Sequence, residues 1–74
     1  MYQPAVVSLR ARLARLVATR DATEQWRAYV DPARVLLLDR CIVATMGDLE
    51  DAGLSGVEIG RLVQDARAET GRRT

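Results

Sequence analysis

Apolar residues between positions 32 and 52 are too dense to fit on one face of a helix. At about 100° per residue, they divide between two sides. The first side is an ordinary core face of Val35, Leu38, Ile42, Thr45, Met46 and Leu49. The other side, which we call the second stripe, consists of Ala33, Leu36, Leu37, Val43, Ala44 and Gly47, with Arg40 in its middle. A helix that is apolar on nearly all sides must be covered on nearly all sides, so either the flanking segments wrap it or another chain covers part of it.

The residues before this segment predict two helices. The first is expected from about Pro4 to Thr19, because proline fits the first turn of a helix. Its apolar face consists of Val6, Leu9, Leu13, Leu16 and Val17. A short second helix is expected next, because Asp21 and Glu24 have the spacing of a capping box. Its apolar patch consists of Trp26, Tyr29 and Val30.

Asp31 and Pro32 predict the start of the long apolar helix. Proline disfavours helical geometry at the residue before it, which leaves Asp31 able to cap the helix that Pro32 opens. We favour one helix that continues through Gly47 to about Ala52. The alternative is a break at Gly47, with Asp48 and Asp51 capping a new turn. Gly53 is then suited to the turn that ends it.

Another capping box, Ser55 and Glu58, predicts a last helix that runs to about Glu69 and stops at Gly71. Its buried face is Ile59, Leu62, Val63 and Ala66. No segment alternates with a period of two, so strands are not expected. The sequence therefore predicts an all-α fold: one domain over residues 1–74, a small bundle of three to four helices around the apolar helix 32–52.

The size of the chain favours association with another chain. A chain of 74 residues buries only about 60% of its unfolded surface, and small domains gain stability from disulfides, metals or oligomerisation. Cys41 is the only cysteine and is expected to be a small buried hydrophobe. The sequence has no histidine, and one thiol does not make a zinc site. We therefore expect an oligomer without a metal or other cofactor.

The usual sets of catalytic residues are missing from the sequence, which has no histidine and a single cysteine. Nucleophilic and acid–base mechanisms use a nucleophile beside a base, or paired carboxylates in a cleft. Asp48 and Asp51 are neighbours on a helix, but they are interpreted as a solvated helix end. The glycines do not follow a strand, as a phosphate-binding loop requires. We expect no enzymatic activity and no small-molecule substrate.

The second stripe admits two interpretations. It either packs against Trp26 and Tyr29 of the same chain, or it contacts another copy or a different protein. We favour the latter, and predict a non-enzymatic interaction module that acts as a homodimer or as an accessory or inhibitory subunit. The contact residues would be Leu36, Leu37, Arg40 and Val43, with Trp26 and Tyr29 as aromatic anchors, because arginine and aromatic residues are enriched at binding hot spots.

Charge distribution supports an alternative function. The net charge is only +1, but residues 1–20 carry four arginines and no acid. Arg10, Arg12 and Arg15, together with Arg20, would present a basic surface that attracts phosphates at low salt. The alternative is therefore a small DNA- or RNA-binding transcriptional regulator that uses these arginines or the helix at 55–69.

Residues 51–63, with the sequence DAGLSGVEIGRLV, carry a local family resemblance. The segment resembles the helix, Gly-Leu-Ser turn and helix near the end of MerR-type DNA-binding domains, and also the second half of a helix-turn-helix, with Gly53 in the turn. The resemblance implies contact with DNA. Asp48 and Leu49 depart from the helix-turn-helix pattern, and no MerR-type recognition helix and wing precede the segment, so no family is assigned.

Targeting signals are absent from the sequence. The first residues lack the basic and apolar regions of a signal peptide, and no stretch approaches the roughly 20 apolar residues of a membrane span. All eleven basic residues are arginine, and this usage, with many alanines, is typical of a GC-rich bacterial or phage genome. We expect a cytoplasmic protein without a membrane partner.

Overall fold

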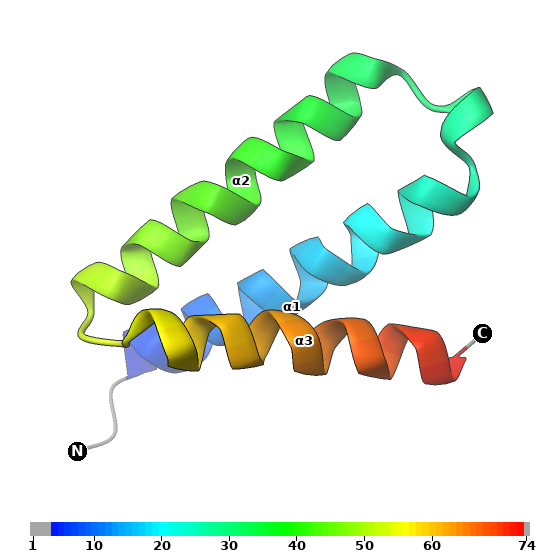
Figure 1. Cartoon of the computed structure of the whole chain (residues 1–74). Coiled ribbons are helices and arrows are strands. Elements are labelled where there is room, and N and C mark those ends of the chain that lie inside the picture. Colours follow the sequence, from blue (N-terminus) through cyan, green and yellow to red (C-terminus); the bar gives the residue numbers. More distant parts are fainter. Residues whose placement is uncertain (1–3, 74) are drawn as a thin grey trace.

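The computed structural model describes residues 4–73, which form three long helices and one turn of 3-10 helix (Figure 1). The helices are α1 (Pro4–Gln25), α2 (Pro32–Asp51) and α3 (Gly56–Arg73), and the 3-10 turn is η1 (Arg27–Tyr29). Residues 4–73 contain no strand. The all-α prediction is therefore confirmed for the described part of the chain.

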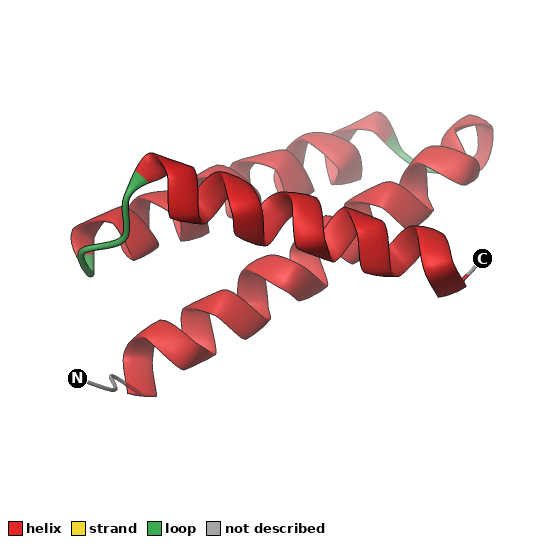
Figure 2. Ribbon diagram, turned by 60° about the horizontal axis from the view of Figure 1, so that its bottom comes forward, coloured by secondary structure: helices red, strands yellow, loops and turns green. Residues whose placement is uncertain are grey.

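The helix around which the others pack is α1. It packs along both α2 and α3, whereas α2 and α3 share few contacts. Figures 1 and 2 show α3 lying across α1, while α2 diverges from α3 beyond the turn that joins them. The prediction that the apolar segment 32–52 is central is wrong, because only one of its two apolar sides packs within the chain, and α1 supplies the buried residues Leu13 and Val17.

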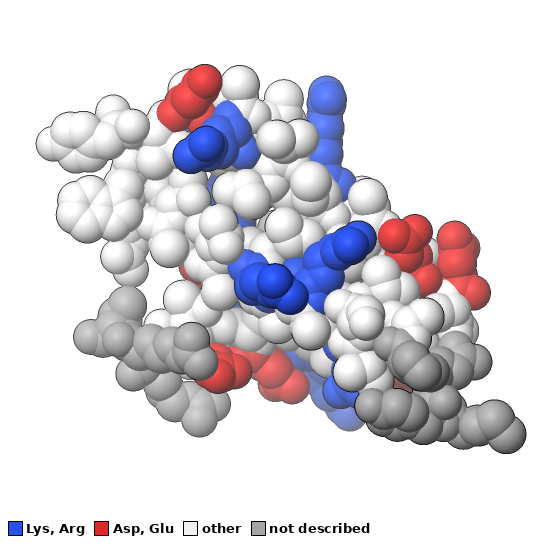
Figure 3. Space-filling view, turned by 180° about the vertical axis from the view of Figure 1, so that it is seen from behind, with Lys and Arg blue, Asp and Glu red and all other residues white. Residues whose placement is uncertain are grey.

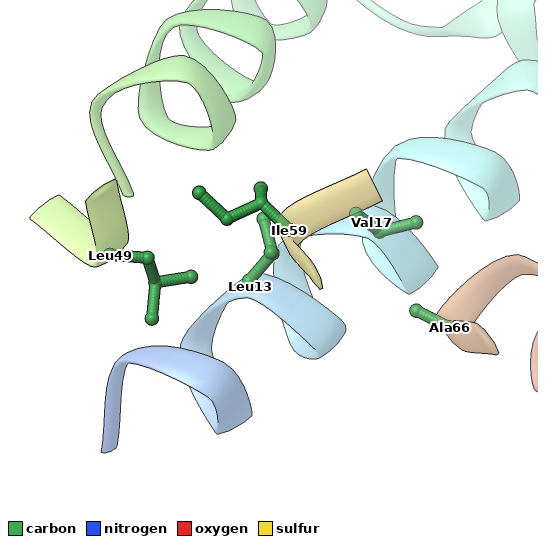
Figure 4. Close-up of a cluster of buried hydrophobic side chains, with 5 residues drawn as sticks. All are labelled: Leu13, Val17, Leu49, Ile59 and Ala66. Atoms are coloured by element: carbon green, nitrogen blue, oxygen red, sulfur yellow. The ribbon is translucent and has the colours of Figure 1, made fainter. Parts of the chain in front are cut away.

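The core lies where the three long helices meet (Figure 4). Its buried apolar residues are Leu13, Val17, Leu49, Ile59 and Ala66. Half-buried neighbours packed against them are Val6, Leu9, Ile42, Met46, Leu54, Leu62 and Val63. Thr45 is also buried, and its hydroxyl donates to the Cys41 carbonyl at 2.8 Å. The predicted core faces of the three long helices are confirmed.

The predicted short helix with a cap at Asp21 is wrong, because α1 continues to Gln25. Its two acids pair with arginines: Glu24 accepts from Arg20 at 2.7 Å and from Arg27 at 3.0 Å, and Asp21 lies 3.8 Å from Arg67 of α3. Pairs spaced by three or four residues stabilise a continuous helix. The chain then turns through η1 rather than through a second α-helix.

The predicted boundaries of α2 are confirmed. The Asp31 carboxylate accepts from the Ala33 N–H at 3.0 Å, which caps the first turn. The helix runs through Gly47 without interruption and ends at Asp51. Gly53 has a φ of +106°, a conformation that favours glycine, and the Leu54 N–H bonds back to the Leu49 carbonyl at 3.1 Å.

In α3, the Ser55 hydroxyl accepts from the Glu58 N–H at 3.2 Å, as the predicted cap requires. The helix continues beyond Gly71 to Arg73, so the predicted stop at Gly71 is wrong. Among the described glycines only Gly53 has a positive φ, and a glycine without that conformation need not end a helix. None of the helices in residues 4–73 is long and apolar enough to cross a bilayer.

Candidate protein-interaction surface

The second stripe is exposed along the length of α2. Leu36, Leu37 and Val43 have exposed fractions of 52%, 61% and 68%. The other members, Ala33, Arg40, Ala44 and Gly47, are exposed as well. In contrast, every residue of the core face of α2 is buried or half-buried. Within a single chain, the fold thus covers only one of the two apolar sides of α2.

The aromatic residues before α2 do not cover the second stripe. Trp26 is 62% exposed and Tyr29 is 86% exposed. The interpretation that they pack on Leu36 and Leu37 within one chain is therefore wrong. Because α1 extends to Gln25, the aromatic residues fall in the short connection 26–31, which forms a corner rather than a helix that could fold back over α2.

Cys41 is exposed, so its predicted burial is wrong. The residue follows Leu37 by four positions and therefore lies on the same side of α2 one turn later. The next residue, Ile42, lies on the core face and is half-buried. The apolar residues around Cys41 in the sequence suggested that it is buried, but these residues belong to both sides of the helix.

The charged residues of α2 other than Asp39 are ordered along the helix. Arg34 and Arg40 lie in its N-terminal half, whereas Asp48, Glu50 and Asp51 lie in its last turn, and all five are exposed. This order opposes the helix macrodipole, which favours acids near the N-terminus and bases near the C-terminus. Apart from the capping Asp31, the first turn holds no acid, and the last turn holds no base.

A network of ion pairs holds the corner between α1 and α2. The Arg20 Nε donates to the Asp39 carboxylate of α2 at 2.8 Å, and another guanidinium nitrogen donates to Glu24 at 2.7 Å. The hydrogen bond from Arg20 and the charge of Arg27 hold the pKa of Glu24 below its ordinary value. The bonds to Glu24 and Asp39 in turn raise the pKa of Arg20. Asp39 and Arg20 are thus engaged within the chain.

The four arginines of α1 do not share one surface. Arg12 and Arg15 line one shallow groove along α1 together with Ser8 and Thr19. Arg10 lines a different groove between α1 and α3, which it shares with Arg61 and with two acids of α3, Glu58 and Asp65. Arg20 belongs to the ion-pair network.

Figure 3 shows one face of the molecule, with basic side chains in the middle and also toward the upper and lower edges, and acidic side chains near the margins. Uncharged residues separate many of the charged groups on this face. The view therefore shows mixed charge rather than a broad basic surface.

Comparison with protein-family models, with curated proteins and with solved structures finds no match to this chain.

The contact residues predicted from the sequence include the exposed leucines but not the exposed charged residues toward the ends of α2. Arg34, Asp48, Glu50 and Asp51 were not included among the contact residues, because the acids were interpreted as a solvated helix end. Their order against the macrodipole was available in the sequence once the bounds of the helix were known. The order makes the N-terminal end of the second stripe basic and its C-terminal end acidic.

Proposed function

We propose that this protein is a non-enzymatic interaction module that binds another polypeptide through the second stripe of α2. The observation that carries the proposal is the exposure of Leu36, Leu37 and Val43, at 52%, 61% and 68%. Full burial of such a side chain contributes about 1.5–3 kcal/mol. A small domain has a total stability of only about 5–15 kcal/mol. Covering this surface would therefore add substantially to the stability of the protein.

The composition of the surface also suits a protein partner. Its apolar centre contains Arg40, a residue type that is enriched at binding hot spots. Charged residues lie toward its ends, as in the polar rim of an interface. Trp26 and Tyr29, at the corner that precedes α2, add two exposed aromatic anchors.

The test compares the wild-type chain with Leu36→Asp and Val57→Asp. Leu36 belongs to the second stripe, whereas Val57, which is 70% exposed, lies on α3 and serves as the matched control. Mass in solution is measured by light scattering, first for the pure chain and then after capture from the native host. Circular dichroism reports the helix content of each variant.

Wild-type protein and Val57→Asp are expected in assemblies larger than the 8.2 kDa chain, as a homodimer or with a captured protein. Leu36→Asp should remain helical and lose this assembly, because a carboxylate would be buried in the interface. A single-chain mass with no captured protein would overturn the proposal. So would an assembly that Leu36→Asp leaves intact.

Arg12 and Arg15 support a second candidate function, binding of DNA or RNA. They share a groove along α1, and neither pairs with an acid among the described residues. Two arginines contribute less to the affinity for phosphates than the four-arginine surface expected from the sequence would contribute. Binding of duplex DNA that weakens with salt and is lost in Arg12→Ala/Arg15→Ala would support this function over the first.

A further inference from the structure

We infer that the partner on the second stripe is a second copy of this chain, with the two α2 helices antiparallel about a two-fold axis. This inference rests on the proposed function and names its partner. In a two-fold interface the same surface lies on both copies, so the surface must complement itself when it is reversed. The second stripe meets this requirement in side-chain size and in charge.

Side-chain size changes along the second stripe. Its N-terminal half carries Ala33 and both leucines, Leu36 and Leu37, whereas its C-terminal half carries Val43, Ala44 and Gly47. Antiparallel pairing places the leucines of each copy toward Ala44 and Gly47 of the other, which lets the two surfaces interdigitate. Parallel pairing would instead place large residues against large ones and leave a gap between the small ones.

Gly47 has no role within a single chain that would explain a glycine. A Cβ built at this position meets nothing within 4 Å, and its φ is not positive. Glycine inside a helix is less stable than alanine. Close approach of the two α2 helices explains the glycine, because a residue without a side chain leaves room for a leucine of the second copy.

The charged residues of α2 also favour antiparallel pairing. Arg34 and Arg40 of one copy lie toward the end of α2 that carries Asp48, Glu50 and Asp51 in the other, and the two-fold axis repeats this contact. None of the five forms an ion pair with another described residue. Parallel pairing would place like charges together, which is unfavourable. The other acids of the N-terminal half are engaged, since Asp31 caps α2 and Asp39 bonds to Arg20.

The macrodipole of α2 gives an independent reason for the antiparallel direction. The charged residues of α2 are unfavourably placed with respect to its own dipole, with Arg34 in the first turn and acids in the last. An antiparallel neighbour has the opposite dipole, so its N-terminal end lies beside those acids. An arrangement that is unfavourable in one chain becomes favourable in the pair.

The size of a typical interface indicates how much of the surface around the second stripe a dimer would use. A helix of 20 residues is about 30 Å long. A standard interface covers about 800 Å² of each partner, or about one seventh of the 5674 Å² surface of this chain. An interface of this size would therefore include the charged ends of the second stripe and the adjoining corner as well as its apolar residues.

Charge-reversed variants test the inference. The acidic variant is Arg34→Glu/Arg40→Glu, and the basic variant is Asp48→Arg/Asp51→Arg. Two of these substitutions, Arg34→Glu and Asp51→Arg, improve the match between charge and macrodipole in a single chain, so α2 should remain helical. Sedimentation velocity of each variant alone, and of an equimolar mixture, measures pairing.

Each variant alone should pair at least about tenfold more weakly than the wild type, because like charges then face each other across the axis. The mixture should restore a two-chain species, because acidic ends then meet basic ends. Variants that pair as tightly alone as the wild type would overturn the inference. So would a mixture that stays at the mass of one chain.

Salt distinguishes the two directions of pairing. In the antiparallel arrangement the end charges attract, so added salt should raise the dissociation constant of the wild-type pair. In a parallel arrangement the same charges repel, and added salt would lower the dissociation constant. A lower dissociation constant at high salt would therefore overturn the antiparallel direction.

Gly47→Ala provides a test in which folding and pairing respond in opposite directions. The methyl group should raise the thermal midpoint of the dilute single chain and weaken pairing by about tenfold, because it fills the space that receives a leucine. The matched control is Gly60→Ala on α3, where a Cβ also meets nothing within 4 Å. It should raise the midpoint and leave pairing unchanged, and equal effects of the two substitutions on pairing would contradict the close approach.

The failure of self-pairing can be told apart from the failure of the proposed function. A wild-type chain that stays at 8.2 kDa, yet captures another protein that Leu36→Asp does not capture, overturns self-pairing alone. A chain that stays at 8.2 kDa and captures nothing overturns both.

Discussion

The two apolar sides of α2 differ in what covers them. On the core face, Leu49 is completely buried against α1 and α3, and Ile42 and Met46 pack against the same core. On the second stripe, Leu36 and Leu37 are more than half exposed. The two sides carry similar residues on the same helix, so composition alone does not distinguish them. The neighbours that the fold provides decide which side is buried.

This difference separates residues that stabilise the chain from residues that are available for binding. Substitution on the core face should affect folding at any protein concentration. Substitution on the second stripe should have little effect on the dilute chain and a large effect on assembly. The predictions below test this separation, beginning with the largest expected effect.

Leu49→Ala should destabilise the chain by about 2–5 kcal/mol, because it leaves a cavity in the core. For a domain of this size, such a loss is a large share of the total stability. The matched substitution Leu37→Ala removes an exposed side chain and should change the stability of the dilute chain by less than about 1 kcal/mol. Urea denaturation at low protein concentration measures both, and equal losses would contradict the difference between the two sides.

Gly53→Ala should destabilise the chain by about 1–2 kcal/mol, because a φ of +106° is strained for a residue with a Cβ. Gly47→Ala should instead stabilise the dilute chain by up to about 1 kcal/mol, because Gly47 has helical geometry and open space around it. Thermal denaturation followed by circular dichroism compares the two. A loss of stability in both would show that Gly47 is needed within the single chain.

The ion pairs at the α1–α2 corner should give a small loss of stability in acid. The pKa of Glu24 lies below its ordinary value of 4.5, first because of the hydrogen bond from Arg20. A carboxyl with a lowered folded pKa contributes stability above its unfolded pKa and loses it as the pH falls through the folded value. Glu24→Gln should therefore be less stable than the wild type near neutral pH, and the difference should shrink below pH 4.5. A difference in stability between Glu24→Gln and the wild type that does not depend on pH would show that it does not come from the ionised Glu24 carboxylate.

Binding of nucleic acid should be the weakest effect. The arginines of α1 are divided between surfaces, so we expect duplex DNA to bind only at low salt and without dependence on its sequence. Fluorescence anisotropy with a labelled duplex measures this binding. Affinity that persists at physiological salt would favour the second candidate function.

Helical spacing was sufficient to predict the inner faces and several helix boundaries. Asp31 and Gly53 have local roles, capping and positive φ, that depend on few neighbours. Leu13, Val17 and Leu49 were placed correctly because a period of 3.6 residues separates a buried face from an exposed one. These features depend on residues close together in the sequence.

Features that depend on a choice between competing local pairs, or on contacts between distant residues, were not predicted. The pattern of Asp21 and Glu24 fits a helix start, but pairing of Glu24 with Arg20 and Arg27 accompanies a continuous helix. The apolar density of 32–52 suggested a central helix, yet the fold places α1 at the centre. Exposure of the second stripe was left open by the sequence, because it depends on where Trp26 and Tyr29 lie after folding.

The most direct test is the dependence of the melting temperature on protein concentration. An associating chain gains stability by mass action, whereas the stability of a single chain does not depend on concentration. The melting temperature of the wild type should rise with concentration, while that of Leu36→Asp should stay constant and equal to the wild-type value at high dilution. A wild-type melting temperature that is the same at every concentration would contradict pairing of two copies through the second stripe.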